Sequence, residues 1–168
     1  MRVAIDNRAV IHSGIGNYSA VLLSLLPQVN EDIETIAYED TLTVNRQGLW
    51  NKYINGLRRV IKDQITIFGW ARKQNIEIFH NPRNTGVPIF CPCKVVVTIH
   101  DVIPHVFPKF YLSNYIERLY YEIMIRLSIY RSDRIITISE FSKSELIKYY
   151  QVPAEKIIVT PLACSDKF

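Results

Sequence analysis

A run of β-branched residues near the middle of the chain constrains the fold most strongly. Residues 95–99 read Val-Val-Val-Thr-Ile, without the polar alternation that a half-exposed strand would show. Such a run predicts a strand that is buried on both faces, as strands of parallel sheets are.

The same kind of apolar run recurs along the chain and alternates with helical patterns. Strands are predicted over residues 2–6, 33–38, 76–79, 95–99, 134–138 and 156–160. Helices are predicted over residues 17–26, 49–73, 112–130 and 139–150. This alternation predicts an α/β fold with a mostly parallel sheet and helices on both faces, in a single Rossmann-like domain. We expect that domain to span residues 1–160, with a linker beginning at residues 161–168.

The positions of prolines and apolar residues predict three further details of the helices. Pro27 should end the first helix, and Pro104 and Pro108 should keep their segment out of helix. The helix over residues 112–130 carries apolar side chains at helical spacing. Its expected buried stripe is Leu112, Ile116, Leu119, Ile123 and Leu127.

His100 and Asp101 come directly after the buried run, where ligands bind in open α/β sheets. The pair could act in general acid–base catalysis, position a ligand or hold a metal. Adjacent side chains at a strand end diverge, which argues against a His–Asp relay. We therefore expect His100 to be a neutral donor or acceptor beside a polar ligand, and Asp101 to hold the loop. The plain alternative is a strand-end histidine that caps a loop.

Two glycines, Gly14 and Gly16, stand at the start of the first predicted helix. Glycines allow a ligand to approach the backbone, and a helix N-terminus offers N–H groups to an anion. A plain turn would explain the same spacing. A nicotinamide-binding site is disfavoured because Ser19 occupies the third glycine position and the glycines lie well beyond Asp6.

Polar pairs also follow two other predicted strands: His80-Asn81 and Ser139-Glu140. Parallel strands would bring both pairs to the same sheet edge as His100. Polar residues after strands are also ordinary caps and turn formers.

The charge distribution and the cysteine content indicate what kinds of partner and compartment to expect. The net charge is +4, and basic residues concentrate in the middle of the chain. The basic, aromatic stretch 46–73 could lie on an anionic bilayer, or it could be an amphipathic helix with a solvated basic face. No apolar run is long enough to span a membrane. Three cysteines at irregular spacing indicate reduced thiols and a cytoplasmic protein. Binding of the basic stretch to a bilayer would make it peripheral at the inner face of the membrane.

Several motifs together resemble the N-terminal, acceptor-side domain of family-four retaining glycosyltransferases of the GT-B fold, most closely the mannosyltransferase type. The most specific pieces are Thr-Ile-His-Asp-Val-Ile-Pro at residues 98–104 and Ile-Thr-Ile-Ser-Glu-Phe-Ser at residues 136–142. The matching pieces also include Ile5-Asp6-x-Arg8, Ser-Gly-Ile-Gly-x-Tyr at residues 13–18, and residues 152–161.

The resemblance implies roles for individual residues. His100 would contact the transferred sugar and is the expected catalytic residue. The glycine loop would lie near the donor diphosphate and the acceptor hydroxyl. The other expected donor- or acceptor-binding residues are Asp6, Arg8, Gly14, Ile15, Gly16, Asn17, Tyr18, His80, Asn81, Asp101, Ser139 and Glu140.

The resemblance also implies a nucleotide-sugar co-substrate, retention of configuration, and a glycan or lipid-linked acceptor. It implies no metal, no other cofactor and no nucleic-acid partner. The donor-binding C-terminal domain of such enzymes has no counterpart in these 168 residues, so we expect this domain alone to have little or no activity. The alternative is a stand-alone carbohydrate- or nucleotide-binding module without catalysis.

Overall fold

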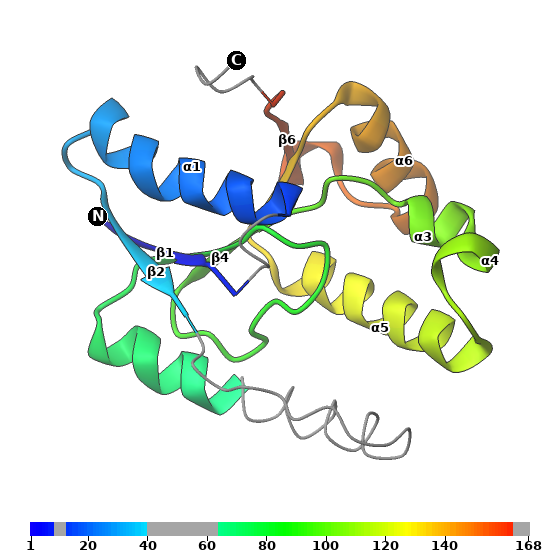
Figure 1. Ribbon diagram of the computed structural model, residues 1–168, viewed down its shortest axis with the longest axis horizontal. Coiled ribbons are helices and arrows are strands. Elements are labelled where there is room, and N and C mark those ends of the chain that lie inside the picture. Colours follow the sequence, from blue (N-terminus) through cyan, green and yellow to red (C-terminus); the bar gives the residue numbers. More distant parts are fainter. Residues whose placement is uncertain (9–12, 40–63, 163–168) are drawn as a thin grey trace. The chain divides into compact units, whose positions relative to one another are not determined.

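The computed structural model describes residues 1–8, 13–39 and 64–162 (Figure 1). The chain forms two compact units. Unit 1 comprises residues 1–82 and 88–94, and unit 2 comprises residues 83–87 and 95–168. Each unit is described separately below.

Unit 1 is built on three parallel strands: β1 (Arg2–Asp6), β2 (Glu34–Tyr38) and β3 (Ile78–Asn81). The strand β1 lies in the centre, paired with β2 on one side and β3 on the other. The helix α1 (Gly14–Val29) connects β1 to β2, and a helix over residues 64–73 precedes β3. The central strand is buried from Val3 to Asp6, as its apolar sequence predicts.

Helices cover both faces of the sheet in unit 1 (Figure 1). The hydroxyl of Thr35 donates a hydrogen bond to the carbonyl of Leu23 in α1. The ring of Tyr38, three positions along the same strand, contacts Trp70 of the other helix, with the ring centroids 4.9 Å apart. Because side chains alternate across a strand, these two contacts lie on opposite faces.

The prediction that Pro27 ends the first helix is wrong by half a turn, since α1 continues to Val29. A proline lacks the N–H group that would reach the carbonyl four residues earlier, here that of Leu23. The Thr35 hydroxyl supplies the missing donor at 2.9 Å. A tertiary hydrogen bond therefore lets the helix pass through its proline.

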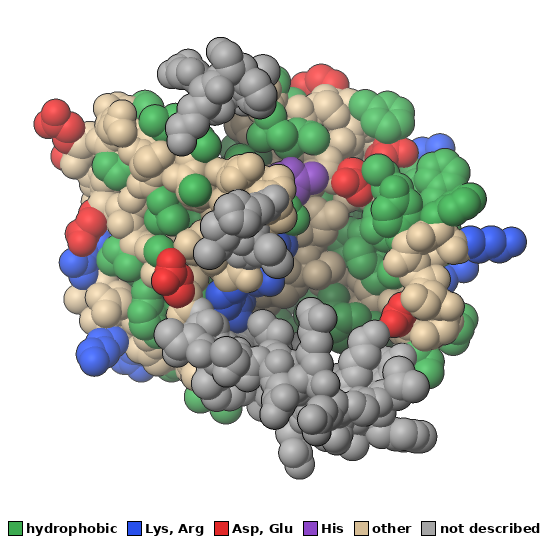
Figure 2. Space-filling model, viewed as in Figure 1, with side chains coloured by type: hydrophobic (Ala, Val, Ile, Leu, Met, Phe, Trp, Pro, Cys, Tyr) green, Lys and Arg blue, Asp and Glu red, His purple; other side chains and the backbone are tan. Residues whose placement is uncertain are grey.

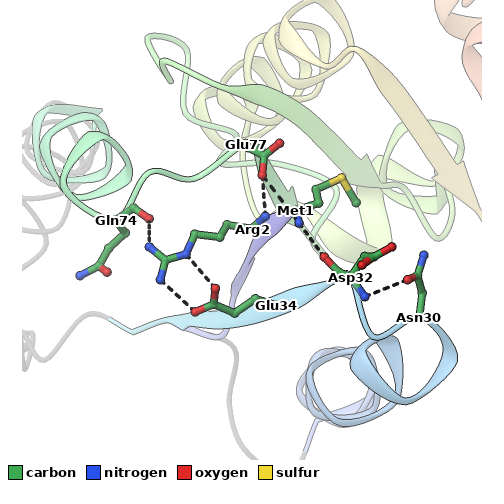
Figure 3. A network of polar contacts seen from close by, with 7 residues as sticks. All are labelled: Met1, Arg2, Asn30, Asp32, Glu34, Gln74 and Glu77. Carbon is green, nitrogen blue, oxygen red and sulfur yellow. Dashed lines mark hydrogen bonds and ion pairs between the residues drawn. The ribbon is translucent and has the colours of Figure 1, made fainter.

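At the amino ends of these strands, Arg2 ties the elements of unit 1 together (Figure 3). Its guanidinium donates to both carboxylate oxygens of Glu34 on β2 and to the carbonyl of Gln74. Its backbone N–H donates to Glu77. This network lies away from the carboxyl ends of the strands, where the candidate site residues are.

Unit 2 repeats the parallel arrangement with β4 (Lys94–Thr98), β5 (Arg134–Thr137) and β6 (Ile157–Val159). The strand β5 pairs in parallel with both β4 and β6. Its helices are α3 (Ile103–Val106), α4 (Pro108–Tyr111), α5 (Tyr115–Arg131), α6 (Glu140–Tyr150) and the 3₁₀ turn η1 (Ala154–Lys156). Val95, Val97 and Ile99 are fully buried. The prediction of a Rossmann-like α/β fold with parallel strands is confirmed, while the domain boundary at residue 160 stays a prediction.

Prolines do not keep residues 103–111 out of helix, contrary to the prediction. Pro104 and Pro108 stand in the first turns of α3 and α4. The first turn of a helix tolerates proline because its N–H groups have no intrahelical partner. The segment therefore forms two short helices.

The predicted buried stripe of α5 is also wrong. Ile116, Leu119 and Ile123 are exposed, and the buried side chains are Met124, Ile125 and Ser128. The helix carries apolar side chains on more than one side, so their spacing alone cannot tell which side packs. In the structure, the side of α5 that packs on the core of unit 2 is the one that carries Ser128.

In the described residues, no helix is long and apolar enough to span a bilayer. Of the basic stretch 46–73, residues 46–63 lie outside the described part. The helix over residues 64–73 buries Ile67 and Ala71 and exposes Arg72 and Lys73. That helix is amphipathic with a core-facing side, and lipid binding by this stretch stays a prediction.

Candidate functional site

In unit 1, the candidate residues gather at the carboxyl ends of β1 and β3. Ile5 pairs with His80, so Asp6 and Asn81 come next on neighbouring strands. His80 and Asn81 form the end of β3 rather than following it, because this strand runs two residues further than predicted. Asp6 and Asn81 are fully buried, and His80 is nearly so.

Asp6 and Arg8 form a bidentate ion pair. The Arg8 Nε and Nη2 atoms lie 2.9 Å and 2.7 Å from the two carboxylate oxygens. The side chains are 0% and 5% exposed, and the guanidinium stacks on the ring of Tyr38 at 5.0 Å. A buried charge pair of this kind holds Arg8 against the end of β1.

The glycine segment begins α1. The Ser13 hydroxyl caps this helix by accepting from the N–H of Gly16 at 3.0 Å. Gly14 and Asn17 are exposed, and nothing lies within 4 Å of a Cβ placed on Gly14. The ring of Tyr18 packs edge-on against His80, with ring centroids 6.2 Å apart. The helix start and the end of β3 are therefore neighbours in unit 1, with Ile15 half-buried between the two glycines.

In unit 2, His100 is held through its backbone. Its N–H donates to the side-chain oxygen of Asn84 at 3.0 Å. Its carbonyl accepts from the hydroxyl of Ser142, also at 3.0 Å. The preceding Ile99 donates to Ile136, so the ladder of β4 continues up to the histidine. The imidazole is half-exposed, whereas residues 97–99 are buried.

Asp101 and Ser139 both make local contacts that shape the loops around His100. The Asp101 carboxylate accepts from the N–H of Ile103, and its carbonyl accepts from Asn84. The Ser139 hydroxyl caps α6 by accepting from the N–H of Ser142, and it donates to the Ser142 hydroxyl. Glu140 is exposed in the first turn of α6.

Sequence reasoning missed Asn84 and Ser142, which hold His100 from 16 and 42 positions away. No local pattern links such distant residues. Ser142 did carry a signal, since it belongs to the motif at residues 136–142. That the candidate residues of unit 1 and of unit 2 lie at one common sheet edge stays a prediction.

No group of three His, Cys, Asp or Glu side chains could hold a metal ion in residues 1–8, 13–39 and 64–162.

The sequence of the chain matches a known protein family. Residues 26–165 match the family described as Glycosyltransferase Family 4, which covers most of the chain. The chain belongs to glycosyltransferase family 4. This confirms the family resemblance that the motifs carry.

Two relatives in this family are named as mannosyltransferases. The chain is 32% identical over 100 residues to O-antigen chain mannosyltransferase B of Escherichia coli, covering 59% of the chain and 25% of that protein. It is 30% identical over 63 residues to O-antigen chain mannosyltransferase RfbU of Salmonella typhimurium, covering 38% of the chain and 17% of that protein. The matches thus span a quarter or less of these relatives.

A glycosyltransferase crystal structure from Rickettsia africae also matches. It is 16% identical, with a TM-score of 0.44, over 95% of this chain and 42% of that chain.

Proposed function

We propose that this chain is the acceptor-side domain of a retaining glycosyltransferase that uses a nucleotide sugar. The acceptor is a glycan or a lipid-linked acceptor, and mannose is the preferred candidate for the transferred sugar because both named relatives are mannosyltransferases. The observation that carries the proposal is the two-sided support of His100 at the end of a buried strand.

That support suits a residue that must meet a sugar in a fixed position. Both backbone hydrogen bonds of His100 end on side chains, so the peptide cannot rotate without breaking one of them. His100 is only half-buried, so a sugar hydroxyl can approach its side chain. A group held in position before the substrate arrives stabilises a transition state without a further ordering cost.

In unit 1, Gly14 and Asn17 are the accessible residues at the start of α1, where backbone N–H groups can face a phosphate or a hydroxyl. Asp6 and Arg8 are buried and paired with each other, so their proposed role is to position this segment rather than to touch substrate. Tyr18 and His80 support the same segment through their ring contact.

Three further expectations belong to the proposal. A donor-binding domain supplies the nucleotide site, so the isolated chain has little or no transferase activity. Transfer needs no metal or other cofactor, and chelators should leave the rate unchanged. The enzyme works on the cytoplasmic side of the membrane.

Replacing His100 by Ala in the polypeptide that joins this chain to its donor-binding domain tests the proposal. We expect the turnover number for sugar transfer to fall roughly a hundredfold or more, as for other lost transition-state contacts. The melting temperature should change little, because the supporting hydrogen bonds use the backbone of His100. Wild-type turnover in this variant would refute the assigned role.

His105→Ala is the matched control. His105 is a second half-buried histidine of unit 2, and it contacts Glu122 rather than the loop at the end of β4. This variant should lose some stability and keep its turnover number. A loss of turnover in both variants would indicate a general disturbance of unit 2.

A further inference from the structure

Unit 2 exposes a set of large apolar side chains on and around α4 and α5. We call this set the α4–α5 apolar surface. Its members are Phe107, Phe110, Tyr111, Tyr115, Ile116, Leu119, Tyr120 and Ile123. Phe110 is 85% exposed, Tyr115 76% and Ile116 60%. Hydrophobic side chains gather over α3 and α4 in Figure 2.

The core of unit 2 does not account for this surface. The buried side of α5 carries Met124, Ile125 and Ser128. Ile116, Leu119, Tyr120 and Ile123 form a second apolar stripe with the i, i+3, i+4, i+7 spacing of a contact face. Exposed apolar patches of this kind mark interaction sites.

The charges beside the surface are mainly positive. Lys109 and Arg118 are exposed on the same helices, while the exposed Arg126 lies 3.8 Å from the Glu122 carboxylate. The two carboxylates of α5 have partners within the unit: Glu117 accepts from the N–H of Ser113, and Glu122 lies 2.6 Å from the ring of His105. The surface therefore combines apolar side chains with two exposed cations, Lys109 and Arg118, and little exposed negative charge.

We propose that the α4–α5 apolar surface docks this chain on an anionic lipid bilayer. Tyrosine and phenylalanine favour the boundary between headgroups and acyl chains, where an apolar ring and a polar tip are both accommodated. Lysine and arginine at the rim are attracted to an anionic surface. This is a different surface from the basic stretch 46–73, and the proposal does not depend on glycosyl transfer.

A bilayer fits these charges better than a second copy of the chain. Self-association through this surface would bring Lys109 and Arg118 of one copy near the same cations of the other. The surface has few exposed carboxylates to pair with them. Anionic headgroups supply the missing charge.

The surface is also anchored to the rest of its unit. His105 of α3 contacts Glu122 of α5, and its ring lies 5.0 Å and 5.2 Å from the rings of Tyr149 and Tyr150 of α6. The helix α4, which carries Phe110 and Tyr111, begins two residues after α3 ends and contacts it. Docking would need little ordering of the chain.

Co-sedimentation of the 168-residue chain with phosphatidylcholine vesicles, with and without phosphatidylglycerol, tests the proposal. We expect binding to the anionic vesicles at low salt and weaker binding at high salt. Phe110→Ser should weaken the binding about tenfold, since an inserted phenylalanine loses its apolar contact. Arg118→Glu should weaken it by a similar factor, roughly tenfold or more, because two charges change.

Phe141→Ser is the matched control, since Phe141 is a 70% exposed phenylalanine on α6. Its binding should equal that of the unchanged chain. Equal losses in both phenylalanine variants, or no binding to anionic vesicles at low salt, would overturn the proposal. A loss in Lys73→Glu without one in Phe110→Ser would place the contact on the helix over residues 64–73 instead. A lipid-free dimer in sedimentation velocity that Phe110→Ser dissociates would show that a second copy covers the surface.

Discussion

The hydroxyl of Ser142 donates a 3.0 Å hydrogen bond to the carbonyl of His100, 42 positions earlier in the chain. Ser142 also receives a hydrogen bond from Ser139, the cap of α6. The start of α6 and the end of β4 are thus joined by one short chain of hydroxyl groups. This joint makes the position of the histidine depend on a helix that is remote in sequence.

Removing this joint should lower both stability and activity. Ser142→Ala loses the contact with the His100 carbonyl at a nearly buried site, at a cost of about 1–2 kcal/mol of unfolding free energy. The turnover number of the enzyme carrying this variant should also fall. Urea unfolding and a transfer assay measure the two effects. Ser144→Ala removes an exposed hydroxyl of the same helix that bonds only locally, and it should change neither quantity. If the two variants behave alike, the joint does not position His100.

Breaking the buried Asp6–Arg8 ion pair should lower the unfolding free energy far more than breaking the exposed Arg2–Glu34 pair. Asp6→Asn leaves the Arg8 guanidinium buried beside a neutral partner, which should cost about 3–5 kcal/mol of unfolding free energy. Glu34→Gln weakens the solvent-exposed pair with Arg2 and should have little effect. Chemical denaturation of the two variants gives the comparison. Similar small losses in both would show that the Asp6–Arg8 pair does not stabilise unit 1.

Replacing Gly14 tests whether the glycine is needed for folding or for binding substrate. A Cβ at this position would meet nothing within 4 Å, so Gly14→Ala should keep the stability or raise it by at most about 1 kcal/mol. If the start of α1 receives substrate, the same methyl group should lower the turnover number or raise the KM. Thermal unfolding and steady-state kinetics report the two effects separately. Unchanged kinetics would remove Gly14 from the substrate-binding segment.

Alkaline pH should destabilise unit 2 through its tyrosines. Burial raises the pKa of Tyr121 to about 12, and burial together with the nearby Glu122 carboxylate raises the pKa of Tyr150 further. The unfolded chain loses these protons first, near pH 10, so the stabilisation is present below about pH 10 and is lost as the pH rises towards 12. Tyr121→Phe should flatten this decline in a series of melting temperatures.

Tyr130→Phe is the control for that series, because its side chain is 86% exposed in the folded chain as well. Its melting temperatures should decline with pH as those of the unchanged chain do. An equally steep decline in Tyr121→Phe would show that this tyrosine does not set the alkaline limit.

The sequence predicted the strands and the family through local signals. Apolar, β-branched runs such as residues 95–99 favour strands of a parallel sheet, and the motif around His100 carries the family resemblance in consecutive residues. Strand limits shifted slightly, as at β3, which takes in His80 and Asn81, because the ladder of hydrogen bonds continues as long as a neighbouring strand is present.

Contacts between residues that are far apart in the chain were revealed only by the tertiary structure. The sequence by itself determined the parallel α/β fold, the family and the strand-end position of His100. Only the folded chain showed that Asn84 and Ser142 hold this histidine, that Thr35 lets α1 pass Pro27, and that α5 packs through Met124 and Ile125. The physical reason is the same in each case. Periodicity and motifs report the preferences of neighbouring residues, whereas the partner of a backbone group and the buried side of a helix depend on which distant surfaces the fold brings together.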